Sequence, residues 1–237
     1  VTDENGVAIF SEIPIGTYTI YEDEKTVPTA YLVADPQNVT VTYAETKEVP
    51  IENKEKTGSI TVHKTTEGQK NIEGIKFYLR GTSDSGRAID IPATTDKDGI
   101  AKFDGVPIGT YMVIEDEETV PYGYLVADEK EVKVEYAQTI DETILNNEQT
   151  GTVKVHKKTA DMTNVEGIRF ILSGISDTGR EIRIEATTDK DGLAKFEGVP
   201  VGTYTITEDG STVPYGYLVA DSKQVTVAYA QTVDTDM

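Results

Sequence analysis

Apolar and polar residues alternate in short runs along this 237-residue chain, as they do in strands with one buried and one solvated face. Turn sequences such as SDSG, TDKDG and VPYG separate the runs. The pattern predicts strands at 59–65, 74–80, 87–91, 100–103, 110–115, 123–127, 131–136 and 140–146. No stretch keeps the helical period of about 3.6 residues, so we expect an all-β protein of tandem antiparallel β-sandwiches with about seven strands per unit.

The pattern recurs every 93 residues without a gap, since Asp3, Asp96 and Asp189 begin equivalent turns (96 − 3 = 93 and 189 − 96 = 93). This frame predicts three units: 1–57 as the C-terminal half of a repeat, 58–150 as a complete repeat, and 151–237 as a repeat lacking its last strand. Only NKEKTG and NNEQTG join one unit to the next. Such short connections favour a semi-rigid rod in which neighbouring repeats are each other's partners.

The charge balance narrows the possible partners. The chain has 42 acidic and 22 basic side chains and a formal charge of −20, which disfavours nucleic acid and anionic membranes. Cysteine is absent, which excludes disulfides, and no apolar run approaches the roughly 20 residues of a membrane span. The chain begins without Met or a signal peptide, so we interpret it as part of a longer protein.

A lysine interrupts the first strand of each repeat on its buried face. Ile60 and Val62 alternate toward the core, and Lys64 is next in phase. Lys157 occupies the same position in the last repeat. A lone lysine here would be read as a strand-end residue whose amine reaches water.

A glutamate follows the same rule on the strand GTYMVIE. Tyr111 and Val113 share a face and Glu115 follows on it, with equivalents at Glu22 and Glu208. With the asparagine described next, the lysine and the glutamate make three polar residues that each end an apolar alternation. Three such residues are harder to explain as accidents of strand ends, because burying a charge costs several kcal/mol.

An asparagine on the final strand is the third such residue. Asn146 is in phase with the apolar positions and matches Asn53 of the first unit (53 + 93 = 146). A one-residue register slip would exchange it for Asn147.

Two interpretations of this lysine, glutamate and asparagine remain open. They can form a buried salt bridge completed by amide hydrogen bonds. They can also react, because burial lowers a lysine's pKa and raises a glutamate's, and a neutral amine is a nucleophile. In a dry core the protonated acid would polarise the amide carbonyl and relay protons while the amine displaces ammonia. The product is a Lys–Asn isopeptide bond made once, without turnover.

The motifs TVHK, TDKDGIAKFDGVPIGTYMVIED, VPYGYLV and ILNN resemble the CnaB-like, or SpaA-type, domains of Gram-positive surface adhesins and pilins. The resemblance covers essentially the whole chain. It implies a prealbumin-like (transthyretin-like) topology, a cell-wall-anchored location on the bacterial surface, and a tip domain outside this chain that contacts host surface or matrix.

The same resemblance assigns roles to the candidate residues. It implies that Lys64 and Lys157 are amine donors and that Asn53 and Asn146 are acceptors. It implies that the catalytic acids are Glu22, Glu115 and Glu208. Only 58–150 contains all three members, because 1–57 has no lysine strand and 151–237 ends before its asparagine.

Other signals have plainer explanations. DKDG and DENG resemble the start of a calcium loop, but position twelve of such a loop would be Pro107, so a tight turn is the better interpretation. His63 and His156 alternate outward and are interpreted as surface residues without a metal or catalytic role. The paired tyrosines of PYGY, which either form an aromatic ligand platform or pack a loop onto the sandwich, are Tyr122 with Tyr124 and Tyr215 with Tyr217.

The sequence therefore predicts structural stalk or shaft repeats, without a cofactor or a bound metal and not an enzyme beyond the single cross-linking event. The alternative is a set of repeats that bind a host matrix protein, a glycan or calcium without a cross-link.

Overall fold

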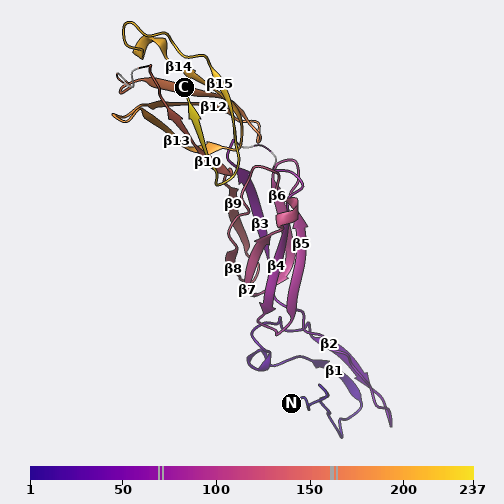
Figure 1. Ribbon diagram of the computed structural model, residues 1–237. Coiled ribbons are helices and arrows are strands. Elements are labelled where there is room, and N and C mark those ends of the chain that lie inside the picture. Colours follow the sequence, from indigo (N-terminus) through magenta and orange to yellow (C-terminus); the bar gives the residue numbers. More distant parts are fainter. Residues whose placement is uncertain (69, 71, 161–162, 164) are drawn as a thin grey trace.

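The computed structural model describes the chain except residues 69, 71, 161, 162 and 164, and its regular secondary structure is almost entirely strands. Figure 1 shows these strands in successive groups from the N-terminus to the C-terminus, arranged end to end as an elongated molecule. The second and third groups each pair a three-stranded sheet with a four-stranded sheet, and the first group is one two-stranded sheet. No helix in the described part of the chain is long and apolar enough to cross a membrane.

The middle repeat is a sandwich of two sheets with orders β6-β3-β9 and β5-β4-β7-β8. Its strands are β3 (Thr57–Thr66), β4 (Lys76–Ser83), β5 (Ala88–Thr94), β6 (Ile100–Pro107), β7 (Gly109–Glu115), β8 (Lys130–Val134) and β9 (Thr139–Asn146). The pairs are antiparallel except β3 with β9, which run parallel side by side. The first and last strands of the repeat are therefore direct neighbours.

Alternation along β3 produces the core of this repeat. Every second residue from Gly58 to Thr66 is buried, so Ile60 and Val62 face the opposite sheet. There they join apolar residues of both sheets, including Phe77, Phe103 and Val113. The strand period of two thus sorts the chain into a dry interior and a solvated surface.

One predicted strand is wrong. Residues 123–127 form no strand, and only an isolated bridge joins Tyr124 to Glu148. The segment begins with a turn in which Tyr124 N–H donates to Pro121 O at 3.3 Å and Gly123 has φ +91°. Apolar residues here pack onto the sandwich from a loop, and their alternation imitates a strand.

The last repeat repeats this architecture with sheets β13-β10-β16 and β12-β11-β14-β15. Its strands are β10 (Thr150–His156), β11 (Arg169–Ser176), β12 (Glu181–Thr187), β13 (Leu193–Pro200), β14 (Gly202–Glu208), β15 (Lys223–Val227) and β16 (Thr232–Asp236). The expectation that this repeat lacks its last strand is corrected, because β16 pairs with β10 in parallel. Five residues suffice for that pairing, although the strand stops before the asparagine position.

The first unit contains one antiparallel pair, β1 (Gly16–Ile20) with β2 (Gln37–Val41). Short 3₁₀ turns follow the glutamate strand in all three units: η1 (Glu24–Thr26), η2 (Glu117–Thr119) and η3 (Gly210–Thr212). An aspartate caps each turn; in the middle repeat Asp116 accepts from Glu118 N–H at 3.2 Å. The apolar residues of the first unit that match buried core positions of the middle repeat, such as Phe10 and Ile13, are exposed.

Candidate functional site

Lys64 lies inside the sandwich, as the alternation on β3 predicts. Its side chain is 0% exposed, and Nζ donates to the carbonyl oxygens of Thr65 at 3.0 Å and Ile144 at 3.1 Å. Burial lowers the pKa of Lys64 below its ordinary value, and the neighbouring Glu115 charge opposes that shift. The amine is thus held in place while its charged form is disfavoured.

Glu115, at the end of β7 in the opposite sheet, reaches both partners with its two oxygens. Its side chain is 1% exposed, and Oε1 lies 3.4 Å from Lys64 Nζ. Oε2 accepts hydrogen bonds from Asn146 Nδ2 at 2.6 Å and from the backbone N–H of Ala127 at 2.8 Å. No hydrogen bond of good geometry reaches Oε1 within the described residues, so this oxygen is open toward the amine.

Asn146 completes the cluster from β9. It is fully buried, whereas Asn147 is exposed, so the register places Asn146 inward. Its Nδ2 also donates to Leu125 O at 2.7 Å, and its Oδ1 has no partner in the part of the chain that is described. Two acceptors therefore hold the amide nitrogen, which is the group that would leave.

The three side chains come from the two facing sheets and meet at one end of the core. Lys64 and Asn146 lie on adjacent parallel strands, where Lys64 pairs with Ile144 and Thr66 pairs with Asn146. Glu115 projects onto them from the facing sheet. The arrangement places one carboxylate between an amine and an amide in a water-excluded site, where electrostatic interactions are strong.

The first unit holds the same acid and amide without a lysine. Glu22 Oε2 accepts from Asn53 Nδ2 at 2.6 Å and from Ala34 N–H at 2.7 Å, and Asn53 Nδ2 donates to Leu32 O at 2.9 Å. These contacts match those of the middle repeat. The acid–amide pair is therefore assembled by the second half of a repeat and does not depend on the amine.

The last repeat holds the complementary half. Lys157 Nζ lies 2.6 Å from Glu208 Oε1, with side chains 6% and 0% exposed, and Glu208 Oε2 accepts from Ala220 N–H at 2.6 Å. The position that matches Asn146 would be 239, beyond the 237 residues of the chain. Among the residues that the structure describes, only those of the middle unit bring all three residue types together.

Sequence reasoning missed the alanine amide that anchors each acid. Ala34, Ala127 and Ala220 donate a backbone N–H to Glu22, Glu115 and Glu208, respectively. The signal was available, because YLVAD recurs in all three units at the same distance from the glutamate. A backbone donor leaves no side-chain signature, so the repeat alone could have indicated it.

The two histidines lie on the outer face and pair with aspartates across the parallel strands. His63 Nε2 is 2.9 Å from Asp141 Oδ1, and His156 Nε2 is 2.9 Å from Asp234 Oδ1. Both histidine side chains are more than 40% exposed. Each pair is a surface contact between a first and a last strand, on the side away from the lysine.

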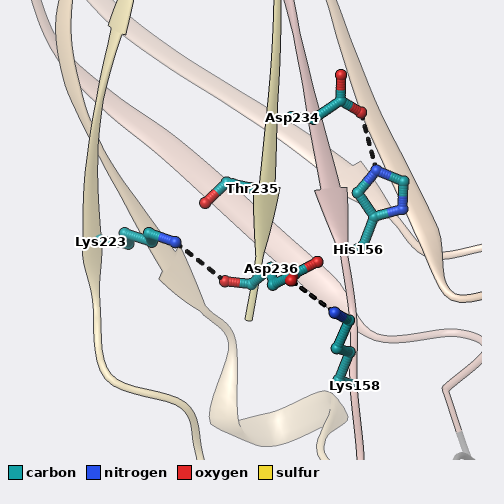
Figure 2. Close-up of a pocket in the computed structure, with 6 residues that line it drawn as sticks. All are labelled: His156, Lys158, Lys223, Asp234, Thr235 and Asp236. Atoms are coloured by element: carbon teal, nitrogen blue, oxygen red, sulfur yellow. Dashed lines mark hydrogen bonds and ion pairs between the residues drawn. The ribbon is translucent and has the colours of Figure 1, made fainter.

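Figure 2 shows the surface pocket that surrounds His156 in the last repeat. It has a volume of about 510 Å³ and is lined by His156, Lys158, Lys223, Asp234, Thr235 and Asp236. Residues of the pocket bind one another, as Lys158 pairs with the Asp236 carboxylate and Lys223 Nζ donates to the Asp236 backbone carbonyl oxygen at 3.4 Å. Neither Lys157 nor Glu208 lines it, so the pocket is separate from the buried cluster.

The remaining motifs behave as turn and packing residues. Asp96 Oδ1 accepts the backbone N–H groups of Asp98 at 2.9 Å and Ile100 at 3.0 Å, which closes the DKDG turn on itself. Tyr124 is buried and donates to Glu67 O at 3.2 Å, whereas Tyr122 is 75% exposed. In the middle repeat the two tyrosines thus divide between packing and surface.

Comparison with known proteins assigns the family. The family described as SpaA, a prealbumin-like fold domain, matches residues 58–149 and again 151–237. The chain belongs to this family. A comparison with curated proteins gave no match.

Solved structures resemble this chain to different degrees. The Bacillus anthracis TIE protein shares its fold, with a TM-score of 0.68 at 21% identity over 100% of this chain, which spans only 44% of that chain. A streptococcal ancillary pilin gives a TM-score of 0.38 at 21% identity over 94% of this chain and 76% of its own. BcpA, the major pilin subunit of Bacillus cereus, gives a TM-score of 0.33 at 13% identity over 77% of this chain and 99% of its own. The SpaA-type repeats described here thus span less than half of the TIE protein chain.

Proposed function

We propose that the chain is a segment of a stalk or shaft on a Gram-positive cell surface, in which each complete SpaA-type repeat is locked by an isopeptide bond between its first and last strands. The proposed units are 1–57, 58–150 and 151–237. The observation that supports this most strongly is the buried contact of Lys64 and Asn146 with one carboxylate, Glu115.

The contacts suggest how the atoms move. Glu115 Oε1 faces Lys64 Nζ and takes a proton from it, which leaves the amine lone pair free to attack Asn146 Cγ. The new C–N bond forms as the Cγ–Nδ2 bond breaks. Oε2 already contacts Nδ2 at 2.6 Å and delivers that proton, so ammonia leaves as a neutral molecule. The attacking nitrogen then gives its second proton to Glu115, which is left protonated beside the new amide.

This geometry changes one detail of the expected mechanism. The acid contacts the amide nitrogen, not the carbonyl oxygen, so its role is to pass a proton from the amine to the leaving group. Desolvation favours the neutral amine, and confinement in the core supplies proximity.

A bond at this position suits a load-bearing module. Force enters one repeat through its first strand and leaves through its last, and the bond would join those strands directly. The parallel pairing of β3 with β9 places them side by side, so a covalent tie would carry load past the sandwich.

The intact mass of the 237-residue chain tests the proposal. We expect a mass lower than the sequence mass by one ammonia, because only the middle repeat contains all three residues. Asn146→Ala is the matched control and should have its full sequence mass. An unmodified wild-type mass would refute the cross-link.

One observation favours a second function, ligand binding by the repeats. Tyr43, Tyr136 and Tyr229 recur at the 93-residue period and are 91%, 51% and 52% exposed. They lie outside the block that carries the family resemblance. An exposed aromatic residue repeated there is the feature expected of a ligand-binding face. A glycan and matrix-protein binding screen tests this, with Tyr136→Ala as the variant expected to reduce any binding.

A further inference from the structure

Two glutamates in the short connections between units are bound by the repeat that follows them. Glu55 and Glu148 are equivalent in the 93-residue frame. Glu148 accepts from Thr178 Oγ1 and from Arg180 Nε at 2.9 Å. Glu55 accepts from Ser85 Oγ and lies 2.8 Å from Arg87 Nη2.

The second of these carboxylates is desolvated. The Glu148 side chain is 0% exposed, and Arg180 is 41% exposed. The hydrogen bond to Glu148 raises the pKa of Arg180 above its ordinary value. A buried carboxylate that loses its partners is strongly destabilised, so the relative placement of the two repeats is tied to these contacts.

The receiving site is built into a β-hairpin of the following repeat. In the turn between β11 and β12, Ser176 Oγ lies 2.7 Å from Thr178 Oγ1 and accepts Arg180 N–H at 3.0 Å. The turn between β4 and β5 has the same contacts, at 2.8 Å between Ser83 and Ser85. The sequences SDSGR and SDTGR thus encode one receptor in two copies.

The backbone of the connection is hydrogen-bonded at Glu148 and at Gln149. Gln149 N–H donates to Gly123 O at 2.7 Å in the preceding repeat, and Val201 N–H of the following repeat donates to Gln149 O at 2.9 Å. The N–H of Glu148 itself donates to Glu67 Oε2 at 2.8 Å. The connection is therefore bound to both repeats at consecutive residues.

We propose that the connection glutamate is a clamp that fixes the angle between successive repeats, with the S-D-[S/T]-G-R hairpin of the next repeat as its partner. This deepens the proposed shaft function and rests on it for its biological role. The clamp differs from the isopeptide bond, because it acts between repeats and the bond acts within one. In Figure 1 the second clamp lies where β9 gives way to β10.

Distance measurements between spin labels test the clamp. The chain has no cysteine, so Thr110→Cys and Thr203→Cys place labels on exposed positions of β7 and β14. We expect one narrow distance distribution in the otherwise unchanged chain. Glu148→Ala and Arg180→Ala should each lose the narrow peak and give a broad distribution.

The matched control is Arg183→Ala, which removes a cation from the same hairpin that pairs with Glu185 at 2.9 Å and not with the connection. It should keep the narrow peak. An unchanged distribution in Glu148→Ala, or equal broadening in Arg183→Ala, would overturn the proposal. Circular dichroism and the loss of one ammonia report separately on the fold and on the cross-link.

A variant at the junction between the first unit and the middle repeat tests the clamp independently of the Glu148 and Arg180 variants. Glu55→Ala should broaden the distribution of distances between labels at Thr40→Cys and Thr110→Cys, which span the first unit and the middle repeat. The distances between labels at Thr110→Cys and Thr203→Cys should stay narrow in this variant. A narrow distribution in that variant would also contradict the clamp.

Discussion

Replacing Glu115 by alanine removes the proposed proton relay and should leave the middle repeat without its cross-link. The bond would enclose 82 residues of sequence separation (146 − 64 = 82), and closing a loop of that size stabilises a fold by about 4.5 kcal/mol in the chain-entropy treatment. The substitution also leaves Lys64, which is 0% exposed, without the carboxylate that faces it. Removing one partner of a buried ion pair costs about 3–5 kcal/mol more.

These two effects are separable with a second variant. Lys64→Met removes the amine and the cross-link and leaves Glu115 without a facing cation, as it also is in the cross-linked protein, where the lysine nitrogen is a neutral amide. Relative to the cross-linked protein it should therefore lose mainly the contribution of loop closure. A loss of about 4.5 kcal/mol corresponds to a decrease of roughly 20–35 °C in melting temperature for a domain of this size. Glu115→Ala should lose more, and its total is comparable with the whole stability of a typical domain, about 5–15 kcal/mol.

Intact mass and urea unfolding measure the two parts. We expect Glu115→Ala and Lys64→Met to retain their full sequence masses and to unfold at lower urea concentration than the cross-linked protein, with Glu115→Ala the less stable. If Glu115→Ala still loses one ammonia at the normal rate, Glu115 is not the relay. If Lys64→Met unfolds at the same urea concentration as the unchanged chain, the bond contributes no stability.

Three further predictions concern the same repeat. In unlinked Asn146→Ala, burial lowers the pKa of Lys64, so the unfolded chain binds more protons and stability should rise with pH toward the ordinary lysine pKa; urea titrations should show this slope, and adding Lys64→Met should abolish it. Gly58→Ala should destabilise the repeat by a few kcal/mol, because a Cβ there would lie 2.6 Å from Glu135 O; a melting temperature equal to that of the unchanged protein would contradict this. Tyr111→Phe should cost about 1 kcal/mol by removing the buried hydrogen bond to the carbonyl of residue 107 (2.8 Å), and a spectroscopic titration of the unchanged protein should find that desolvation raises the pKa of Tyr111 to about 12.

Much of the fold could be predicted from the sequence because strand alternation and turn residues are local. The period of two on β3 sent Ile60, Val62 and Lys64 inward without knowledge of what lay opposite them. The segment 123–127 shows where this logic fails, since alternation also occurs in a loop that packs onto a core. Nothing in the sequence indicated that β3 and β9 run parallel within these antiparallel sandwiches, because strand direction depends on pairing between distant segments.

The sequence alone determined the 93-residue repeat, the all-β class and the three residue types that interrupt the buried faces, because each is a periodic property of the chain. Tertiary structure decided which of these residues meet. Only the parallel pairing of the first and last strands brings Lys64 beside Asn146, and only the facing sheet places Glu115 between them. The partners of Glu148 were equally hidden from sequence, because a charged residue in a polar connection looks solvated until the next repeat packs over it.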